Sequence, residues 1–236
     1  MFKIEVCLTP ELIHLYQPEG KIVVVTDIFR ATSSMVAGLA SGVALIKPVA
    51  SIAESEVFHT NGFFRAGERN GKKIEGFELG NSPLEFILEK YIGERIVMTT
   101  TNGTRAISLS QQAEKVIIGA FLNLQAVINF LLKPQNDVLI FCAGWKGKFS
   151  MEDTLFAGAL CQALEGTYES SGDDSVLAAK SLYSNAEIDL YHYLKSANHT
   201  KRLSGLQFEN DIKFCLEKNR FETIPIINNG FIENMK

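Results

Sequence analysis

Arginines, carboxylates and hydroxyl groups concentrate in four polar segments of this sequence, and each segment follows a run of apolar residues. The segments read TDIFRATSS, GERNGKKIEGFELGNSP, TTTNGTR and AGWKGKFSMED. Guanidinium groups are planar and suit bidentate contacts with phosphate, whereas carboxylate oxygens are the hard ligands that Mg²⁺ prefers. This combination is suited to metal-assisted phosphoryl transfer, in which the cation neutralises oxygen charge and arginines hold the remaining oxygens.

The candidate ligands fall into two groups. The expected anion ligands are arginines, hydroxyl groups and glycines that allow close approach of the backbone, namely Arg30, Arg69, Arg105, Ser82, Thr100, Thr101, Thr104, Gly80 and Gly103. The expected oxygen donors to a divalent cation are the acidic residues Asp27, Glu68, Glu78, Glu152 and Asp153.

Each of these residues also has an ordinary structural interpretation. Asp27 could cap the next helix, and Glu152 and Asp153 could be first-turn acids that a helix dipole favours. Arg105 could pair with a surface glutamate, and His199 is expected to face solvent rather than to act as a base. The agreement of four segments, rather than any single residue, favours the functional interpretation.

The elements that must position these residues alternate along the first two thirds of the chain. Expected strands cover 21–27, 43–49, 63–71, 95–101, 115–120 and 137–144, after an N-terminal strand, and expected helices cover 31–42, 51–58, 81–91, 103–112, 124–132 and 150–164. Ser51, Ser82 and Ser150 are the expected N-caps of three of these helices. The pattern predicts an α/β fold with three layers, in which helices cover both faces of a largely parallel or mixed sheet. Loops after parallel strands lie at one edge of a sheet, so the four polar segments are expected to meet there.

The pattern changes after about Gly166. The polar loop SSGDDS is followed by expected helices over 176–182, 187–197 and 208–219, and by a short strand over 223–227. We interpret 166–222 as a helical subregion within a single α/β domain that spans 1–236.

Composition and charge exclude several classes of protein. The formal net charge of −4 over 236 residues does not favour nucleic-acid binding, and no apolar run reaches the ~18 residues of a membrane helix. The N-terminus has no apolar core or cleavage site of a signal peptide. The four cysteines are scattered without a CxxC pair, which predicts free thiols in a cytoplasmic protein.

The four motifs VVVTDIFRATSS, AGERNGKKIEGFELGNSP, TTTNGTRAI and CAGWKGKFSMEDTLFAGAL together resemble the 2-phosphosulfolactate phosphatase family, also called ComB. The later segments NHTKRLSGLQFENDIKFCLEKN and IPII are similar to the C-terminal pattern of that family. The resemblance implies a Mg²⁺-dependent phosphatase with helices layered around a mixed sheet. It also implies hydrolysis of (2R)-O-phospho-3-sulfolactate to 3-sulfolactate and phosphate, a step of coenzyme M biosynthesis, or of a related small acidic phosphoester.

Residue roles follow from this chemistry as expectations. Asp27 and Glu68 are expected to bind Mg²⁺, with Asp153 as a third direct or water-bridged ligand. The remaining expected substrate contacts are anion clamps at Arg30, Arg69 and Arg105, a phosphate or sulfonate cradle at Thr101, Asn102, Gly103 and Thr104, and a pocket lining at Asn81 and Ser82. The expected nucleophile is a metal-activated water, and direct attack by Asp27 is the alternative.

Three other interpretations compete with this one. A haloacid-dehalogenase type of phosphatase needs a second acid two residues after its aspartate, where this sequence has Phe29. A dinucleotide-binding dehydrogenase would show GxGxxG after the first strand, and none is present. A non-catalytic module that binds a phosphorylated or sulfonated metabolite stays open, although binding alone would not need a cluster of carboxylates. The sequence does not reveal the oligomeric state, and a homodimer is expected only because two-fold assemblies are common.

Overall fold

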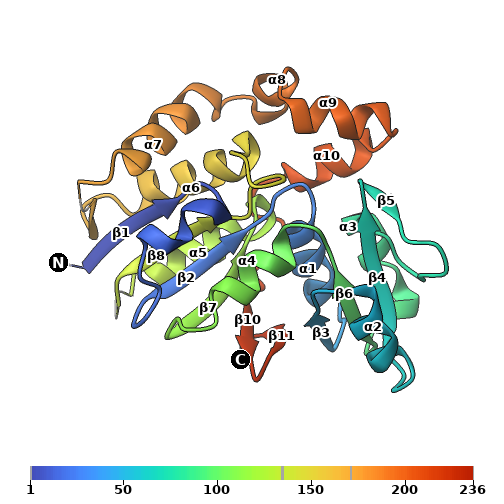
Figure 1. Cartoon of the computed structure of the whole chain (residues 1–236). Coiled ribbons are helices and arrows are strands. Elements are labelled where there is room, and N and C mark those ends of the chain that lie inside the picture. Colours follow the sequence, from blue (N-terminus) through green and yellow to red (C-terminus); the bar gives the residue numbers. More distant parts are fainter. Residues whose placement is uncertain (1, 134–135, 171, 236) are drawn as a thin grey trace.

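The computed structural model describes residues 2–133, 136–170 and 172–235, so that Ser171 of the predicted polar loop lies outside the described residues. Figure 1 shows a twisted sheet with helices packed around it. The strands are β1 (Phe2–Cys7), β2 (Ile22–Thr26), β3 (Leu45–Pro48), β4 (Phe64–Arg69), β5 (Lys72–Lys73), β6 (Arg95–Thr99), β7 (Lys115–Gly119), β8 (Val138–Cys142), β9 (Tyr168–Ser170), β10 (Pro225–Asn228) and β11 (Phe231–Asn234). The α-helices are α1 (Ala31–Ala40), α2 (Ile52–His59), α3 (Pro83–Phe86), α4 (Gly103–Leu109), α5 (Leu124–Leu131), α6 (Met151–Ala163), α7 (Asp174–Ala186), α8 (Leu190–Leu194), α9 (Asn198–Gly205) and α10 (Glu209–Cys215). Short 3₁₀ helices are η1 (Pro10–Leu15), η2 (Glu89–Tyr91) and η3 (Phe121–Asn123).

The sheet consists of two parallel groups of strands joined by an antiparallel hairpin. Its order over the described residues is β5-β4-β6-β3-β11-β10-β7-β2-β8-β1-β9. Strands β4, β6 and β3 run parallel to one another, as do β7, β2, β8, β1 and β9. The C-terminal hairpin of β10 and β11 lies between the two groups and pairs antiparallel with β7 and β3. Because three antiparallel pairings separate β3 from β7, the two parallel groups run in opposite directions along the sheet.

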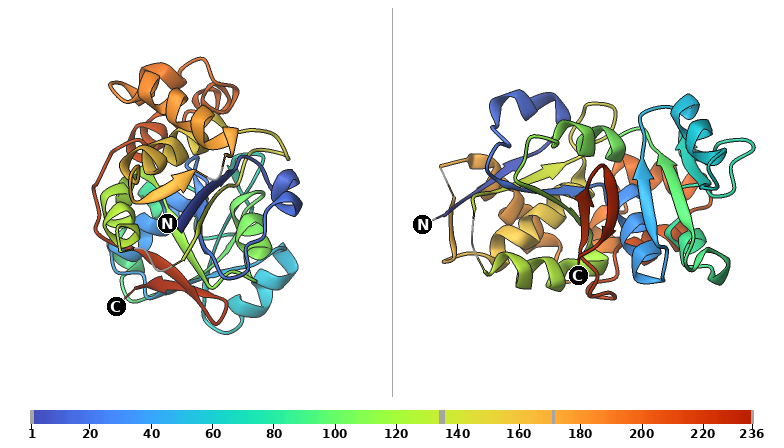
Figure 2. Two further views of the ribbon diagram at one scale, coloured as in Figure 1. Left: turned by 90° about the vertical axis from the view of Figure 1, so that its left-hand side faces the viewer. Right: turned by 90° about the horizontal axis from the view of Figure 1, so that it is seen from below.

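Burial explains why the central strands could be predicted from the sequence. Every residue of β2 and of β8 is buried, which is expected of continuous apolar strands that are covered on both faces. Helices lie on both sides of the sheet in Figure 2. The predicted α/β fold, with three layers and a mixed, largely parallel sheet, is confirmed.

The predicted helix starts are only partly correct. The Ser51 side chain caps α2 by accepting a hydrogen bond from the Glu54 amide at 3.1 Å, as predicted. Ser82 and Ser150 occupy the N-cap positions of α3 and α6, as predicted, but neither side chain makes a capping hydrogen bond. The helix predicted over 81–91 is divided into α3 and η2, since the residues after Pro83 form little more than one turn.

The C-terminal part of the chain differs most from the prediction. It contains four helices instead of three, together with the edge strand β9, and the predicted final strand is a hairpin that turns at Asn229 and Gly230. Helices α7 to α10 lie together along the upper side in Figure 1, where α7 packs on α6 and α10 packs on α3. Helix α9 was not predicted because its sequence, NHTKRLSG, has one apolar side chain and so no apolar stripe.

Two further expectations concern the surface and the thiols. Within the described part of the chain, no helix is long and apolar enough to cross a membrane. All four cysteines are buried free thiols.

The close packing of α6 on α7 leads to a test of the fold. A Cβ atom on Gly158 would lie 2.1 Å from the carbonyl oxygen of Ala179 in α7, so the two backbones could not keep their present separation. We expect Gly158→Ala to lower the free energy of unfolding by about 3 kcal/mol through overpacking, measured by urea denaturation. The matched control is Gly205→Ala in α9, where an added Cβ would meet nothing within 4 Å. A Gly158→Ala protein as stable as the control would contradict this account of the packing.

Candidate active site

A pocket lies where the segments that follow β2, β4, β6 and β8 meet, and about 460 Å³ of space within it is partly open to solvent. Its lining combines the four predicted polar segments with one helix from the C-terminal region. The lining residues are Asp27, Phe29, Arg30, Glu68, Asn70, Gly71, Asn81, Thr100, Thr101, Asn102, Trp145, Lys146, His199, Arg202 and Leu203. The four segments therefore meet as predicted, and α9 completes the pocket from a part of the chain that the prediction did not include.

Asp27 follows β2 and places a carboxylate in the pocket with little support from the protein. The side chain is buried, and its nearest hydrogen-bond donor is the Ala31 amide at 3.5 Å. Burial raises the pKa of Asp27 to about 6, against the opposing influence of nearby His199, and the negative charge of Glu68 adds to the rise. Asp27 is thus a buried acid whose negative charge is poorly compensated.

Glu68, at the end of β4, is held firmly on both of its oxygens. Oε2 accepts the Gly71 amide at 2.7 Å. Oε1 accepts the Thr101 hydroxyl at 2.8 Å and the Thr101 amide at 3.2 Å. The hydroxyl of Thr101, predicted to hold an anion, instead orients this carboxylate at the edge of the pocket.

The other residues of the predicted cradle stabilise the turn between β6 and α4. Thr104 donates its hydroxyl to the Thr100 carbonyl at 2.9 Å, and its amide donates to the Thr100 hydroxyl at 3.2 Å. A Cβ on Gly103 would lie 2.7 Å from the Ala31 Cβ and 3.0 Å from Oδ2 of Asp27. Glycine is therefore required where α4 begins beside α1. Gly103 and Thr104 do not line the pocket, whereas Thr101 and Asn102 do.

Asp153 has a structural role and does not line the pocket, and its role as a direct or water-bridged metal ligand stays a prediction. Its Oδ1 accepts the Ile28 amide at 2.8 Å and its Oδ2 accepts the Gly144 amide at 3.1 Å, which ties the loop after β2 to the loop after β8. Burial raises the pKa of Asp153 well above its usual range, and the charges of Glu152 and Asp27 add to this effect. No set of three or more acidic, histidine or cysteine side chains within the described ranges is arranged to hold a metal ion.

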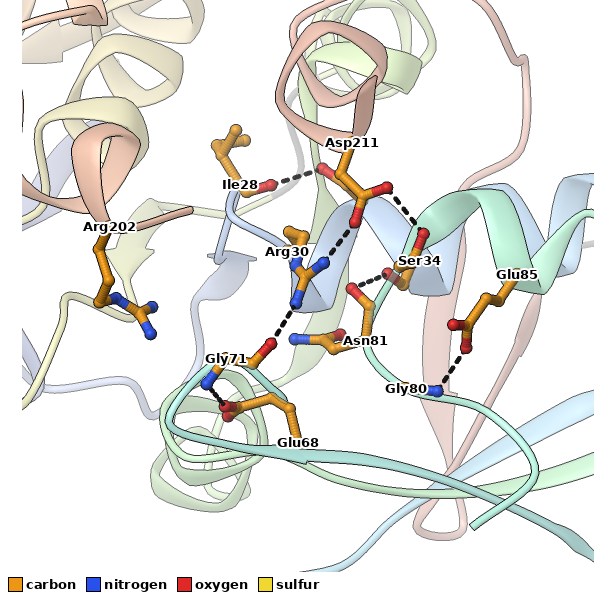
Figure 3. A network of polar contacts seen from close by, with 12 residues as sticks. Ile28, Arg30, Ser34, Glu68, Gly71, Gly80, Asn81, Glu85, Arg202 and Asp211 are labelled. Atoms are coloured by element: carbon orange, nitrogen blue, oxygen red, sulfur yellow. Dashed lines mark hydrogen bonds and ion pairs between the residues drawn. The ribbon is translucent and has the colours of Figure 1, made fainter. Parts of the chain in front are cut away.

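Arg30 lies in the pocket, as expected, but its charge is already paired. Figure 3 shows its guanidinium between α10 and the turn after β4, in contact with the buried carboxylate of Asp211 and with the Gly71 carbonyl at 3.0 Å. The Ser82 hydroxyl donates to Oδ1 of the same Asp211 at 2.8 Å, so Ser82 supports this ion pair instead of lining the pocket. Asn81 does line the pocket, and its carbonyl accepts the Ser34 hydroxyl at 3.1 Å.

The other two predicted arginines do not line this pocket. Arg69 donates to the Glu68 carbonyl at 2.7 Å and to the Thr99 hydroxyl at 3.2 Å. Arg105 pairs with Glu11 at 2.8 Å, and both side chains are about half exposed at the surface. Arg105 thus follows the ordinary interpretation and not the predicted clamp.

The sequence interpretation missed the α9 side of the pocket. His199 was expected to face solvent, but it is buried and its Nδ1 lies 2.6 Å from Oε1 of buried Glu152. The Trp145 ring stacks on the imidazole at a centroid distance of 6.0 Å. Burial acts to raise the pKa of Glu152, but hydrogen bonds, of which the one with His199 is the largest, outweigh it, so this pKa lies below its usual range. The signal that could have revealed this side of the pocket is the pair of Glu152 and His199. These two residues lie 47 positions apart in the chain.

The carboxylates that line the pocket fit one kind of Mg²⁺ site. Mg²⁺ is usually held by one or two carboxylates, with water and substrate phosphate as its other ligands, instead of by a complete protein cage. Asp27 and Glu68 are the carboxylates that line the pocket over the described residues, and Asp27 is buried without adequate compensation. A divalent cation beside them would supply the missing positive charge.

Comparisons with known proteins show which family this sequence is similar to. The sequence model of a family described as "2-phosphosulpholactate phosphatase" matches residues 7–230. A protein of Caldanaerobacter subterraneus subsp. tengcongensis, named "Probable 2-phosphosulfolactate phosphatase", is 43% identical over 216 residues, which cover 90% of each chain. Proteins with the same name from Thermotoga maritima and from a Picosynechococcus strain are 42% and 40% identical, and they cover 90% and 86% of this chain and 91% and 86% of their own lengths.

The poorly compensated charge of Asp27 leads to a prediction about stability. Because its native pKa is raised from 3.8 to about 6, the folded protein binds the proton more tightly than the unfolded chain does. Ionisation of Asp27 therefore costs stability progressively as pH rises through this range, and the cost is complete above it. With EDTA present, Asp27→Asn should raise the free energy of unfolding by about 3 kcal/mol near pH 7.5 and by only about 1 kcal/mol near pH 4.5, measured by urea denaturation.

The control for this measurement is Glu169→Gln, which changes an exposed carboxylate. It should alter the unfolding free energy by less than about 0.5 kcal/mol at both pH values. An Asp27→Asn protein that is less stable than the wild type, or whose advantage does not grow with pH, would show that Asp27 is well compensated.

Proposed function

The chain belongs to the 2-phosphosulfolactate phosphatase family, and we propose that it hydrolyses (2R)-O-phospho-3-sulfolactate, or a related small acidic phosphoester, to the alcohol and phosphate. Members of this family are hydrolases that act on phosphoric monoesters. The resemblance seen in the sequence is thus confirmed, and the alternative of a non-catalytic binding module is set aside.

The observation that carries the proposal is the buried carboxylate of Asp27 in a pocket that also holds Glu68, Arg30 and Arg202. Carboxylates in a pocket repel a bound anion, which raises the free energy of the complex. A pocket for anions is therefore expected to contain carboxylates only if a cation binds together with the anion. Carboxylates and guanidinium groups together suit a phosphate ester that binds with a divalent cation.

We propose Mg²⁺ as this cation, with Asp27 and Glu68 as its protein ligands. When bound, Mg²⁺ would neutralise the charge of the phosphoryl oxygens and lower the pKa of a coordinated water. The protein's own contribution is to hold Glu68 in place through Thr101 and the Gly71 amide. The Asp153 side chain fixes the loop that carries Asp27.

The nucleophile proposed is water, with direct attack by Asp27 as the alternative. The two routes differ in whether phosphate becomes bonded to the protein. Rapid acid quenching with ³²P-labelled substrate would trap label on the chain if Asp27 attacks, and would leave the protein unlabelled if water attacks.

Other features of the proposal extend beyond the site. The buried free thiols favour a reducing compartment, and we propose a cytoplasmic location. We propose a homodimer because two-fold assemblies are common. We also propose that the protein binds neither nucleic acid nor membrane, because its net charge is negative and its sequence has no long apolar run. In a cell that makes coenzyme M, the product 3-sulfolactate would be an intermediate of that synthesis.

The reaction and its cation can be tested together. We expect rapid release of phosphate from 2-phosphosulfolactate with Mg²⁺ and loss of activity in EDTA that Mg²⁺ restores. Asp27→Asn should lower kcat by at least ~10³-fold because it removes a charged ligand of the cation. The control Asp174→Asn changes an exposed carboxylate in α7 and should leave the activity intact.

Two results would contradict the proposal. Turnover that is unaffected by EDTA would remove the divalent cation from the reaction. Near-normal activity of the Asp27→Asn protein would remove Asp27 from it.

A further inference from the structure

The arginines around the pocket differ in whether their charge is already paired. Arg30 pairs with the buried Asp211, and Arg105 pairs with Glu11 at the surface. Arg202, from α9, also lines the pocket. Within the part of the chain that the structure describes, no carboxylate oxygen lies within 4.0 Å of the Arg202 guanidinium. Its positive charge therefore remains available to a ligand.

The contacts that hold Arg202 are neutral ones. Nη2 lies 2.7 Å from Nε2 of His199, and the guanidinium carbon lies 5.2 Å from the centre of the Trp145 ring. Nε is buried and has no hydrogen-bond partner among the described residues. Burial lowers the pKa of Arg202, while Glu68 opposes this effect from a distance. The side chain is thus oriented, although one N–H group lacks a partner and no counter-ion is bound.

Glu152 explains how a histidine can serve as the acceptor. An ionised carboxylate only accepts hydrogen bonds, so the contact at 2.6 Å places the proton of His199 on Nδ1. The other ring nitrogen, Nε2, is then left with its lone pair facing Arg202. A neutral imidazole can hold the guanidinium in this way without cancelling its charge, as a direct carboxylate partner would.

The position of Arg202 places it opposite Arg30 across the turn after β4. The Gly71 carbonyl accepts Arg30 at 3.0 Å, and Nη1 of Arg202 would lie 2.8 Å from a Cβ on Gly71. In Figure 3 the Arg202 side chain reaches from its helix toward Gly71 and Glu68, and no hydrogen bond or ion pair joins it to the other residues drawn. The unpaired guanidinium therefore lies close to the carboxylates that are proposed to hold the cation.

We propose that Arg202 binds the second acidic group of the substrate, a sulfonate or carboxylate, and that Glu152 and His199 position it for this contact. This inference rests on the proposed function. A phosphate monoester with a sulfonate and a carboxylate carries about four negative charges, more than one divalent cation neutralises. Arg202 supplies unpaired positive charge at the pocket, and its planar fork suits oxyanions. It would therefore determine specificity for polyanionic esters over simple phosphate monoesters.

The direct test compares two substrates in Arg202→Met. With 2-phosphosulfolactate we expect kcat/KM to fall at least ~100-fold, mostly through KM, because an ionic contact to the bound substrate is lost. With p-nitrophenyl phosphate, which has one acidic group, the change should stay within ~3-fold. The matched control is Lys201→Met, which removes an exposed charge from the same helix. Equal losses with both substrates, or no loss with either, would overturn the proposal.

The positioning role of His199 is tested by two conservative replacements. Asparagine can place an N–H near the Nδ1 position, which keeps the contact with Glu152 but offers Arg202 no acceptor. Glutamine can place its carbonyl oxygen near Nε2 and so accept from Arg202. We expect His199→Asn to raise KM for 2-phosphosulfolactate ~10-fold more than His199→Gln does, with similar thermal stability of the two variants. Equal KM values would exclude a positioning role.

Binding measurements separate a failure of this inference from a failure of the proposed function. A wild-type protein that releases phosphate from neither substrate would refute the proposed function alone. Arg202 is then still tested by titration calorimetry with 3-sulfolactate and with inorganic phosphate. Arg202→Met should weaken 3-sulfolactate binding at least ~30-fold and phosphate binding less than ~3-fold. Unchanged or equally weakened binding of the two ligands would refute the role of Arg202.

Discussion

Four carboxylates buried in or beside the pocket impose the electrostatic constraint on which the rest of the site depends. A buried negative charge is costly unless hydrogen bonds or a positive charge compensate it. Asp153 accepts two backbone amides, Glu152 contacts His199, and Glu68 accepts an amide and a hydroxyl. Asp27 has only a distant amide. Of these four acids, Asp27 thus has the weakest hydrogen bonding, and it lines the pocket where a cation and its substrate are proposed to bind.

The same contacts hold the loops of the pocket together. Asp153 connects the loops after β2 and β8, and Glu68 connects the turn after β4 with the turn after β6. Asp211 connects α10 with Arg30 and Ser82. Since each connection joins segments that are distant in the chain, the geometry around Asp27 depends on the folded state as a whole. Residues of one chemical type therefore serve as structural ties and as proposed ligands within a single pocket.

The arginines show the same division of roles. A guanidinium that is paired with a carboxylate, such as Arg30 with Asp211, adds to the structure but offers a ligand little net charge. Arg202 is held instead by an imidazole and an indole ring, which orient it and leave its charge uncancelled. Membership of a phosphatase family accounts for a phosphate ester in the pocket, while the pairing of the arginines accounts for where further acidic groups of that ester would bind.

The sequence alone determined the fold class and the central strands, because continuous apolar runs such as β2 and β8 are local patterns. It also identified the four polar segments that meet at the pocket, although the direction of the strands that carry them is set by pairing with the C-terminal hairpin. It did not determine which acids and arginines line the pocket. Asp153 and Asp27 have the same chemistry, and only contacts with Ile28 and Gly144 distinguish them. Helix α9, with His199 and Arg202, was missed because a polar helix that buries few side chains leaves no periodic signal. Desolvation and hydrogen-bond partners arise between distant segments, so only the tertiary structure could decide them.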